Sequence, residues 1–371
     1  MILLELFKAI KEKGGAPFIV GGFVRDKILG FPNKDYDIEV FNITEYDFEN
    51  ILKRFGTFKK VGNFSIYLIR RNIEIYLNIE KKDLSLNEQI YYASRRRDFT
   101  VNALYYDLLN DRIIDYLDGQ KDIEKKILKY SEKVEFLRDP LRILRAVYFF
   151  SKYDFEISND LIDIITLNKE KLKIVSKERI FNEFQKVFKN KKIVSKYFES
   201  LKKLGLNNIL FDENVEFSKI HLLKSNDIND YFAVLALETK SFPCFFVEDK
   251  TIIRNSISIS NSVKLLEKAD EITAYLINKL SRKTNLKSIL RIYGLGNNNK
   301  KEKAVVLYKE YLKRKSTLVP LVEGKDLIEM GYKPNKIFSE ILEELYDLQL
   351  QNKFKNKSEA LEYLKRKNDL L

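Results

Sequence analysis

The chain has 371 residues, of which 45% are hydrophobic and 33% charged, so it is long enough for two or three domains with cores of their own. A single cysteine, Cys244, excludes disulfide frameworks and thiolate zinc sites and favours a cytoplasmic location. A single histidine, His221, excludes histidine-rich metal sites. The longest apolar run is 231–237, too short for the roughly 18 residues of a membrane span, so we expect no membrane partner.

The net charge of +13 favours a polyanionic partner, with nucleic acid first. Part of this charge gathers in the segment 281–315, where tyrosines lie among the lysines and arginines as possible stacking partners for bases. The alternative is a solvated, lysine-rich surface without a specific partner.

The pattern of short apolar segments and turns predicts an α+β region over about 1–130, with a small mixed sheet and helices. In chain order we expect an amphipathic N-terminal helix, a strand over 18–20, a helix over 23–29, a strand over 35–41, a helix over 45–55, a hairpin of 64–70 with 73–79, a helix over 85–94 and a hairpin of 104–108 with 112–116. From Pro140 onward helical periodicity dominates and predicts an all-α remainder, beginning with helices over 140–152, 159–167 and 176–190.

The segment FIVGGFVRDKILGFPNKDYDIEVF combines two features that carry chemistry. Gly21 and Gly22 stand between a strand and a helix, where backbone can approach a phosphate, and Arg25 lies in the first turns of that helix. Asp35 and Asp37 are two residues apart on a strand, so both carboxylates project from one face and can hold Mg²⁺. Each feature is common by itself, but the combination in this order points to phosphate chemistry.

A family resemblance rests on this segment and on four others. They are RRRDFTVNALYYD (95–107), IIDYLDGQKDIEKKIL (113–128), RDPLRILRAVYFF (138–150) and SKERIFNEFQKVF (176–188). Together they resemble bacterial class II tRNA nucleotidyltransferases, which are CCA-adding enzymes, and their poly(A) polymerase relatives. The resemblance covers 17–190 well and 320–365 loosely. It implies a nucleotidyltransferase catalytic head (1–130), a helical neck that recognises the nucleotide base (131–200), and a helical body and tail for tRNA binding (201–371).

The same resemblance implies roles for individual residues. Asp35 and Asp37 would bind Mg²⁺ as the catalytic pair, while Gly22, Arg25 and Arg97 would contact the incoming nucleotide. For Glu74, on the central hairpin, a role as a third carboxylate and a plain surface position are equally open.

Base recognition would come from Asp139, Arg142 and Arg145, which recur at three-residue steps along one side of a helix. A carboxylate accepts from the amino group of cytosine or adenine, and an arginine donates to their ring acceptors, so such a set can read C and A without a template. Tyr148 is a departure, because relatives often have arginine three residues beyond Arg145. Arg179 is expected to brace the site from behind.

The resulting expectation is template-independent addition of CCA to the 3′ end of tRNA from CTP and ATP, with release of pyrophosphate. A poly(A) polymerase and an RNA-binding protein with an inactive head are the alternatives. A partial enzyme that adds only CC is a third, because the connection from Ile79 to Arg95 holds only fifteen residues and no glycine. In three-nucleotide relatives a flexible, glycine-containing loop usually lies there.

Overall fold

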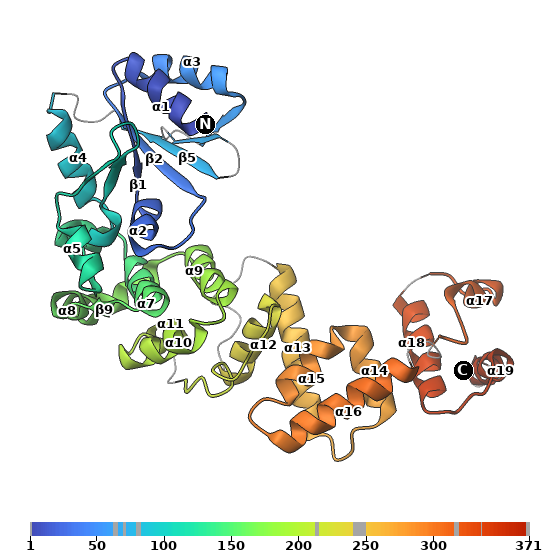
Figure 1. Ribbon diagram of the computed structural model, residues 1–371. Coiled ribbons are helices and arrows are strands. Elements are labelled where there is room, and N and C mark those ends of the chain that lie inside the picture. Colours follow the sequence, from blue (N-terminus) through green and yellow to red (C-terminus); the bar gives the residue numbers. More distant parts are fainter. Residues whose placement is uncertain are drawn as a thin grey trace. The chain divides into compact units, whose positions relative to one another are not determined.

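A computed structural model of the chain describes residues 2–61, 66–69, 72–78, 83–211, 215–239, 250–314, 319–334 and 336–368 (Figure 1). The chain forms two compact units, which are Met1–Val187 with Lys196–Leu210, and Phe188–Ser195 with Phe211–Leu371. The first unit combines a mixed sheet with helices, and the described part of the second is helical, so the predicted α+β class with an all-α remainder is confirmed. The finer division at residues 130 and 200 stays a prediction.

A seven-stranded sheet with the order β3-β4-β5-β2-β1-β6-β7 forms the centre of the first unit. Its strands are β1 (Ala16–Val20), β2 (Tyr36–Phe41), β3 (Phe58–Lys60), β4 (Ile66–Ile69), β5 (Ile73–Leu77), β6 (Tyr105–Asp107) and β7 (Arg112–Ile114). β2 and β5 are parallel, and the other neighbours are antiparallel. Both predicted hairpins are confirmed, β4 with β5 and β6 with β7, although positions 64, 65, 70 and 79 of the first one lie outside the described residues.

Helices of the first unit cover the sheet and continue the chain beyond it. They are α1 (Ile2–Glu12), α2 (Gly22–Leu29), α3 (Glu45–Phe55), α4 (Leu86–Arg95), α5 (Gly119–Glu124), α6 (Lys133–Arg138), α7 (Arg142–Tyr153), α8 (Asn159–Asn168) and α9 (Lys177–Lys189), with α10 (Val194–Lys203) and α11 (Asn207–Phe211) after them. A short two-stranded sheet pairs β8 (Ile127–Leu128) with β9 (Glu156–Ile157). The start of α4 is fixed by a capping box in which Ser85 and Glu88 satisfy each other's backbone N–H groups.

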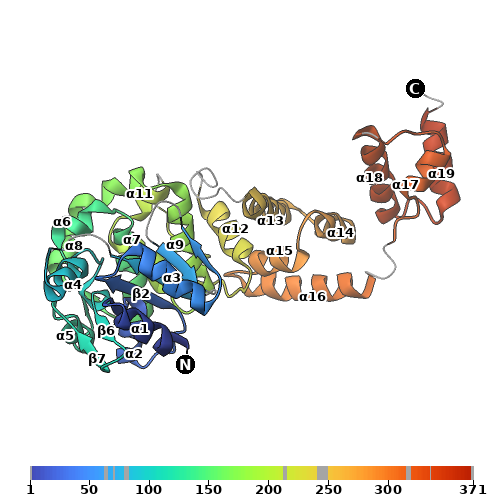
Figure 2. The same ribbon diagram turned by 90° about the horizontal axis from the view of Figure 1, so that it is seen from above.

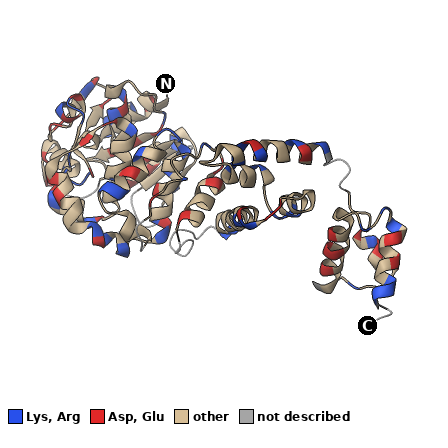
Figure 3. Ribbon diagram, turned by 90° about the horizontal axis from the view of Figure 1, so that it is seen from below, with Lys and Arg blue, Asp and Glu red and all other residues tan. Residues whose placement is uncertain are grey.

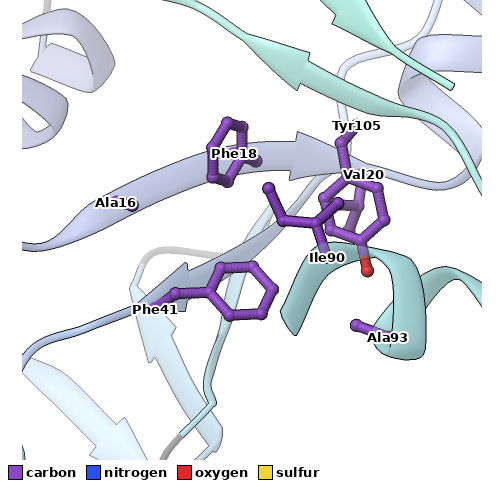
Figure 4. Close-up of a cluster of buried hydrophobic side chains, with 7 residues drawn as sticks. All are labelled: Ala16, Phe18, Val20, Phe41, Ile90, Ala93 and Tyr105. Carbon is purple, nitrogen blue, oxygen red and sulfur yellow. The ribbon is translucent and has the colours of Figure 1, made fainter. Parts of the chain in front are cut away.

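One face of the sheet is apolar at one end and acidic at the other. Phe18 and Phe41 lie in a buried cluster with Ile90 and Ala93 of α4, which covers this face (Figure 4). Phe18 is paired with Glu39, and Val20 with Asp37, so these carboxylates project from the same face of the sheet. The apolar end therefore anchors the sheet, while the acidic end remains for chemistry.

The helix predicted over 140–152 begins two residues later than expected, at Arg142. The N–H of Arg142 donates to the carbonyl of Asp139 at 3.0 Å, and Ile143 N–H donates to Pro140 at 3.0 Å. These three-residue hydrogen bonds form a tighter turn before the α-helix starts. Asp139 therefore ends α6 and caps a turn, rather than capping α7 directly.

The described residues of the second unit fold into helices. They are α12 (Ile228–Glu238), α13 (Lys250–Lys268), α14 (Ala274–Lys283), α15 (Leu286–Tyr293), α16 (Asn298–Arg314), α17 (Gly324–Glu329), α18 (Lys336–Leu350) and α19 (Lys357–Asn368), and Figure 2 shows them from above. α13 packs against α12 and α15, and α15 packs against α16. The three C-terminal helices enclose a core of their own that includes Leu327, Leu345 and Leu364. Within the described part of the chain, no helix is long and apolar enough to cross a membrane.

Candidate active site

Asp37 lies near two other carboxylates, those of Asp35 and Glu74, at the acidic end of the sheet face. Asp35 directly precedes β2, Asp37 lies on it, and Glu74 on β5 is the register partner of Asp37. Because β2 and β5 are parallel neighbours, the Asp37 and Glu74 side chains project from the same face. The sequence left the role of Glu74 open, and the structure places it beside Asp37.

Burial and mutual repulsion raise the pKa of two of these carboxylates, although arginines partly offset this for Asp37. The pKa of Asp37 lies above its ordinary value. Burial raises this pKa most, nearby Arg97 lowers it, and nearby Asp35 raises it. Burial and then Asp37 raise the pKa of Glu74. Among the described residues, no group of three or more His, Cys, Asp or Glu side chains is placed so that it could hold a metal ion. The neighbouring carboxylates of Asp35 and Asp37 still offer the oxygen ligands that Mg²⁺ prefers, and a divalent cation would reduce their mutual repulsion.

The glycine pair predicted at a phosphate lies next to this cluster. Gly21 has φ +69°, and a Cβ on it would lie 3.7 Å from Asp37 Oδ2, so the backbone passes close to the carboxylate. Gly22 begins α2.

Arg25 lies one turn later but is engaged inside the protein. Its guanidinium donates to Asp26 Oδ1 at 2.7 and 2.9 Å, to Asn102 Oδ1 at 2.6 Å and to the Tyr153 hydroxyl at 2.5 Å. It also lies over the ring of Tyr153, with 4.4 Å to the centroid. Arg25 therefore ties α2 to α7, and contact with a nucleotide remains a prediction for it.

A cavity of about 430 Å³ brings together the residues predicted to read the base. Its lining comprises Arg96, Arg97, Asp98, Asp139, Leu141, Arg142, Arg145, Arg179 and Glu183. Arg97 and Arg145 both lower the pKa of Asp37, so this cavity adjoins the carboxylate cluster. Four sequence-predicted residues, from two segments more than forty positions apart, thus share one space.

Two of these groups are held in place by bonds to other elements. Asp139 Oδ2 accepts from Arg179 Nη2 of α9 at 2.7 Å, and Asp139 Oδ1 accepts from the Leu141 N–H at 3.2 Å. The Arg142 guanidinium donates to the carbonyls of Arg96 at 2.7 Å and Glu135 at 2.8 Å. Burial lowers the pKa of Arg142, although nearby Asp98 and Asp139 raise it.

Arg145 is fixed by the buried side chain of Asp98. Its Nε and Nη2 donate to Asp98 Oδ2 at 2.8 and 2.5 Å, and Asn102 Nδ2 donates to Asp98 Oδ1 at 2.9 Å. Burial raises the pKa of Asp98, but Arg145 and Asn102 outweigh it and hold this pKa below its ordinary value. The motif that contributes Arg97 thus also positions Arg145 through its neighbour.

Glu39, which orients Arg97, was not predicted from the sequence. Glu39 is buried and accepts from Arg97 Nη2 at 2.7 Å, from the Tyr105 hydroxyl at 2.7 Å and from Asn78 Nδ2 at 3.1 Å. The sequence did contain a signal for Glu39. An acid two residues after Asp37 on the same strand lies on the same face of the sheet as Asp37, and among apolar neighbours it needs a hydrogen-bond partner.

Two residues of α9 line the cavity although the sequence did not place them there. Arg179 was expected behind the site but lines the cavity, as does Glu183 four residues later. Glu183 Oε1 accepts from Lys186 at 2.6 Å, whereas Glu183 Oε2 is buried without a hydrogen-bond partner among the described residues. The four-residue spacing placed both on one helix face, and this was the signal available in the sequence.

Two family descriptions match this unit and the segment that follows it. Residues 17–129 match the poly A polymerase head domain. Residues 154–217 match the family described as the probable RNA and SrmB-binding site of polymerase A. The first match contains the carboxylate cluster and Arg97, and the second contains Arg179 and Glu183.

Individual relatives extend the similarity over the chain. A CCA-adding enzyme of Staphylococcus epidermidis is 28% identical over 305 residues, which cover 78% of this chain and 73% of that protein. A solved complex of a CCA-adding enzyme with ATP has a TM-score of 0.74 at 23% identity, covering 98% of this chain and 94% of the other. The Thermotoga maritima CCA-adding enzyme complexed with tRNA has a TM-score of 0.65 at 22% identity, covering 98% and 94%. These structural likenesses concern the fold.

Proposed function

We propose that this chain, which matches the poly A polymerase head domain and is similar to CCA-adding enzymes, adds CCA to the 3′ end of tRNA from CTP and ATP. The observation that carries this proposal is the cavity in which Asp139, Arg142, Arg145 and Arg97 meet beside the acidic end of the sheet. One part of this site suits a base and the other suits a triphosphate.

Base selection is assigned to Asp139 and the arginines of α7. The carboxylate accepts from the exocyclic amino group of cytosine or adenine, and a guanidinium donates to the acceptors of the ring. Uracil and guanine present a carbonyl where that amino group lies, so they face a carboxylate with an acceptor. Arg179 holds Asp139 and backbone carbonyls hold Arg142, so the pattern is fixed before a nucleotide enters.

Transfer is assigned to the carboxylate cluster and Arg97. The 3′-hydroxyl of tRNA attacks the α-phosphorus, a new P–O bond forms, and the bond to the β-phosphate breaks as pyrophosphate leaves. Asp35 and Asp37, with Glu74 beside them, would hold Mg²⁺, which supplies stabilisation of phosphate charge when bound. Arg97 offers forked donors to phosphate oxygens, with Glu39 fixing its direction.

A CC-adding enzyme is the second candidate, and one observation favours it. The connection before Arg95 is taken up by α4 from Leu86 onward, and its capping box fixes the start of that helix. A short connection of this kind has little freedom to remodel the cavity from a cytosine to an adenine site. Residues 79–82 of the connection lie outside the described residues.

Incorporation of labelled nucleotides into tRNA lacking its 3′ CCA tests the proposed activity. CTP alone should label the RNA, UTP and GTP should not, and Asp37→Asn should abolish labelling. Labelling by ATP alone into long tracts would instead indicate a poly(A) polymerase. No labelling with any nucleotide would favour an RNA-binding protein with an inactive head.

A further inference from the structure

The second unit contains a larger cavity, of about 740 Å³, between α15, α16 and the segment around Leu222. Since RNA is the substrate proposed above, we infer that this cavity binds one unstacked nucleotide of that RNA. Its base would lie against Tyr308 and the apolar floor, and its phosphate would lie at Arg291 and the surrounding lysines.

The lining has the composition that such a ligand requires. Its apolar part includes Leu222, Leu290, Leu295 and Val305, and Tyr308 adds an aromatic ring. Its charged residues are all basic, namely Lys224, Lys287, Arg291, Lys301 and Lys309. Apolar walls with an aromatic ring accept a base, and basic side chains around them accept its phosphate.

Arg291 is the best-defined cation of this cavity because a buried acid holds it. Asp230, which is 0% exposed, accepts from Arg291 Nη1, and Ser225 Oγ accepts from the same nitrogen at 2.6 Å. Ser225 Oγ also donates to Asp230 Oδ2 at 2.5 Å. The hydrogen bonds that Arg291 makes to described side chains use Nη1, which leaves the donors on Nε and Nη2 for a ligand. An arginine held in this way loses little freedom when it binds a phosphate.

The turn between α15 and α16 also lines the cavity. A Cβ on Gly294 would lie 3.0 Å from Lys301 Cα, so the two helices approach closely at this point. Asn297 Oδ1 accepts the N–H of Lys300 at 3.0 Å at the start of α16. α16 then runs along the cavity, which it lines from Asn298 to Lys309.

The basic residues that line this cavity distinguish it from a general apolar docking surface. Lys and Arg recur along α16, which also carries Glu302 and Glu310, and Figure 3 colours both kinds of charge. No acidic side chain is among the residues that line the cavity. Folded RNA offers unstacked nucleotides in its loops and ends, which proteins bind through stacking and phosphate contacts.

Two pairs of variants test the inference with tRNA lacking its 3′ CCA as the probe. Lys309→Glu lies in the cavity lining, and Lys303→Glu makes the same charge change at an exposed position of α16 outside it. We expect the Kd for tRNA to rise about tenfold with Lys309→Glu and less than about twofold with Lys303→Glu. Tyr308→Ala should raise the Kd about tenfold, because stacking is lost, whereas Tyr308→Phe should bind as the natural chain does.

The salt dependence of the Kd for tRNA distinguishes the phosphate contact of Lys309 from the stacking contact of Tyr308. Lys309→Glu should lower the slope of log Kd against log salt by about one or more, while Tyr308→Ala should leave that slope unchanged. Equal effects of the two lysine variants, or an unchanged Kd with Tyr308→Ala, would overturn the inference. So would preferential binding of an acidic peptide that is lost with Tyr308→Ala while tRNA binding stays. Incorporation of CMP by the natural chain, measured alongside, separates these outcomes from failure of the proposed activity.

Discussion

Asp98 is predicted to stabilise the first unit by holding Arg145 at the nucleotide cavity. The change Asp98→Asn keeps nearly the same volume but removes the negative charge that accepts from Arg145 Nε and Nη2. The Asp98 side chain is 8% exposed and that of Arg145 is 32% exposed, so water only partly replaces the lost bond. Arg145 is then left next to a neutral amide in a cavity that Arg142 also lines.

The expected loss follows from these contacts. Hydrogen bonds to charged groups contribute about 1.5–3 kcal/mol each, and breaking a buried pair costs about 3–5 kcal/mol. Because Arg145 reaches water, the lower end applies, and we expect Asp98→Asn to reduce the free energy of unfolding by about 3 kcal/mol. For a unit of this size that corresponds to a fall in Tm of about 6–12 °C.

Thermal denaturation with a matched control tests this value. Asp118→Asn removes the same charge from a side chain that is 69% exposed and pairs with Lys121 at 2.9 Å. Exposed pairs contribute little, so its Tm should change by no more than about 2 °C. Equal changes in Tm for the two variants would refute the assigned role of Asp98.

The pH dependence of the unfolding free energy is a second test of the Asp98–Arg145 pair. The pKa of Asp98 lies below its ordinary value in the folded protein, so its contribution is complete above the unfolded pKa of about 3.9. This contribution is lost as the pH falls through the folded pKa. The difference in unfolding free energy between the natural chain and Asp98→Asn should therefore be constant from about pH 5 to 7 and shrink below about pH 4. A difference that grows in acid would contradict the assignment.

Three further predictions concern the nucleotide and the RNA. Asp35→Asn or Asp37→Asn should abolish transfer while Tm and tRNA affinity stay, and near-normal turnover in Mg²⁺ would exclude them as metal ligands. Arg179→Met should raise the KM for CTP and ATP about tenfold, because Asp139 loses its partner. Arg138→Met, at a side chain that is 68% exposed, should leave these KM values unchanged. Equal KM values for the two variants would exclude Arg179 as the residue that holds Asp139. Affinity for tRNA should fall at least about a hundredfold between roughly 50 and 200 mM salt, and a flat salt dependence would contradict the importance of the basic surface.

Much of the first unit was predictable because its signals are local. The helix over 45–55, the capping box at Ser85 and the two hairpins follow from neighbouring residues, and the structure has them within a few positions. β3, of three residues, was missed because FKK lacks the alternation that marks a strand. The start of α7 was placed two residues early, because Asp–Pro is compatible with both a helix start and a tight turn.

The candidate site was predictable as a set of residues but not as an arrangement. Spacing placed Asp139, Arg142 and Arg145 on one side of a helix, but only the two arginines lie on α7, and Asp139 lies before it. The structure still brings all three into one cavity and adds Arg97 from a distant segment. Contact of Arg25 with a phosphate stays a prediction, and its protein partners Asn102 and Tyr153, 77 and 128 residues away, were beyond the reach of any local pattern. Long-range partners of this kind decide whether an arginine faces a ligand or the protein.

The length and sequence of the product made from tRNA that ends at its discriminator base test the central claim most directly. With CTP and ATP together, we expect a product extended by CCA. With CTP alone, we expect a product extended by CC. Arrest after CC with ATP present would contradict CCA addition and establish the partial enzyme. Long tracts of A, or extension by UTP or GTP, would contradict the reading of the base by Asp139 and the arginines of α7.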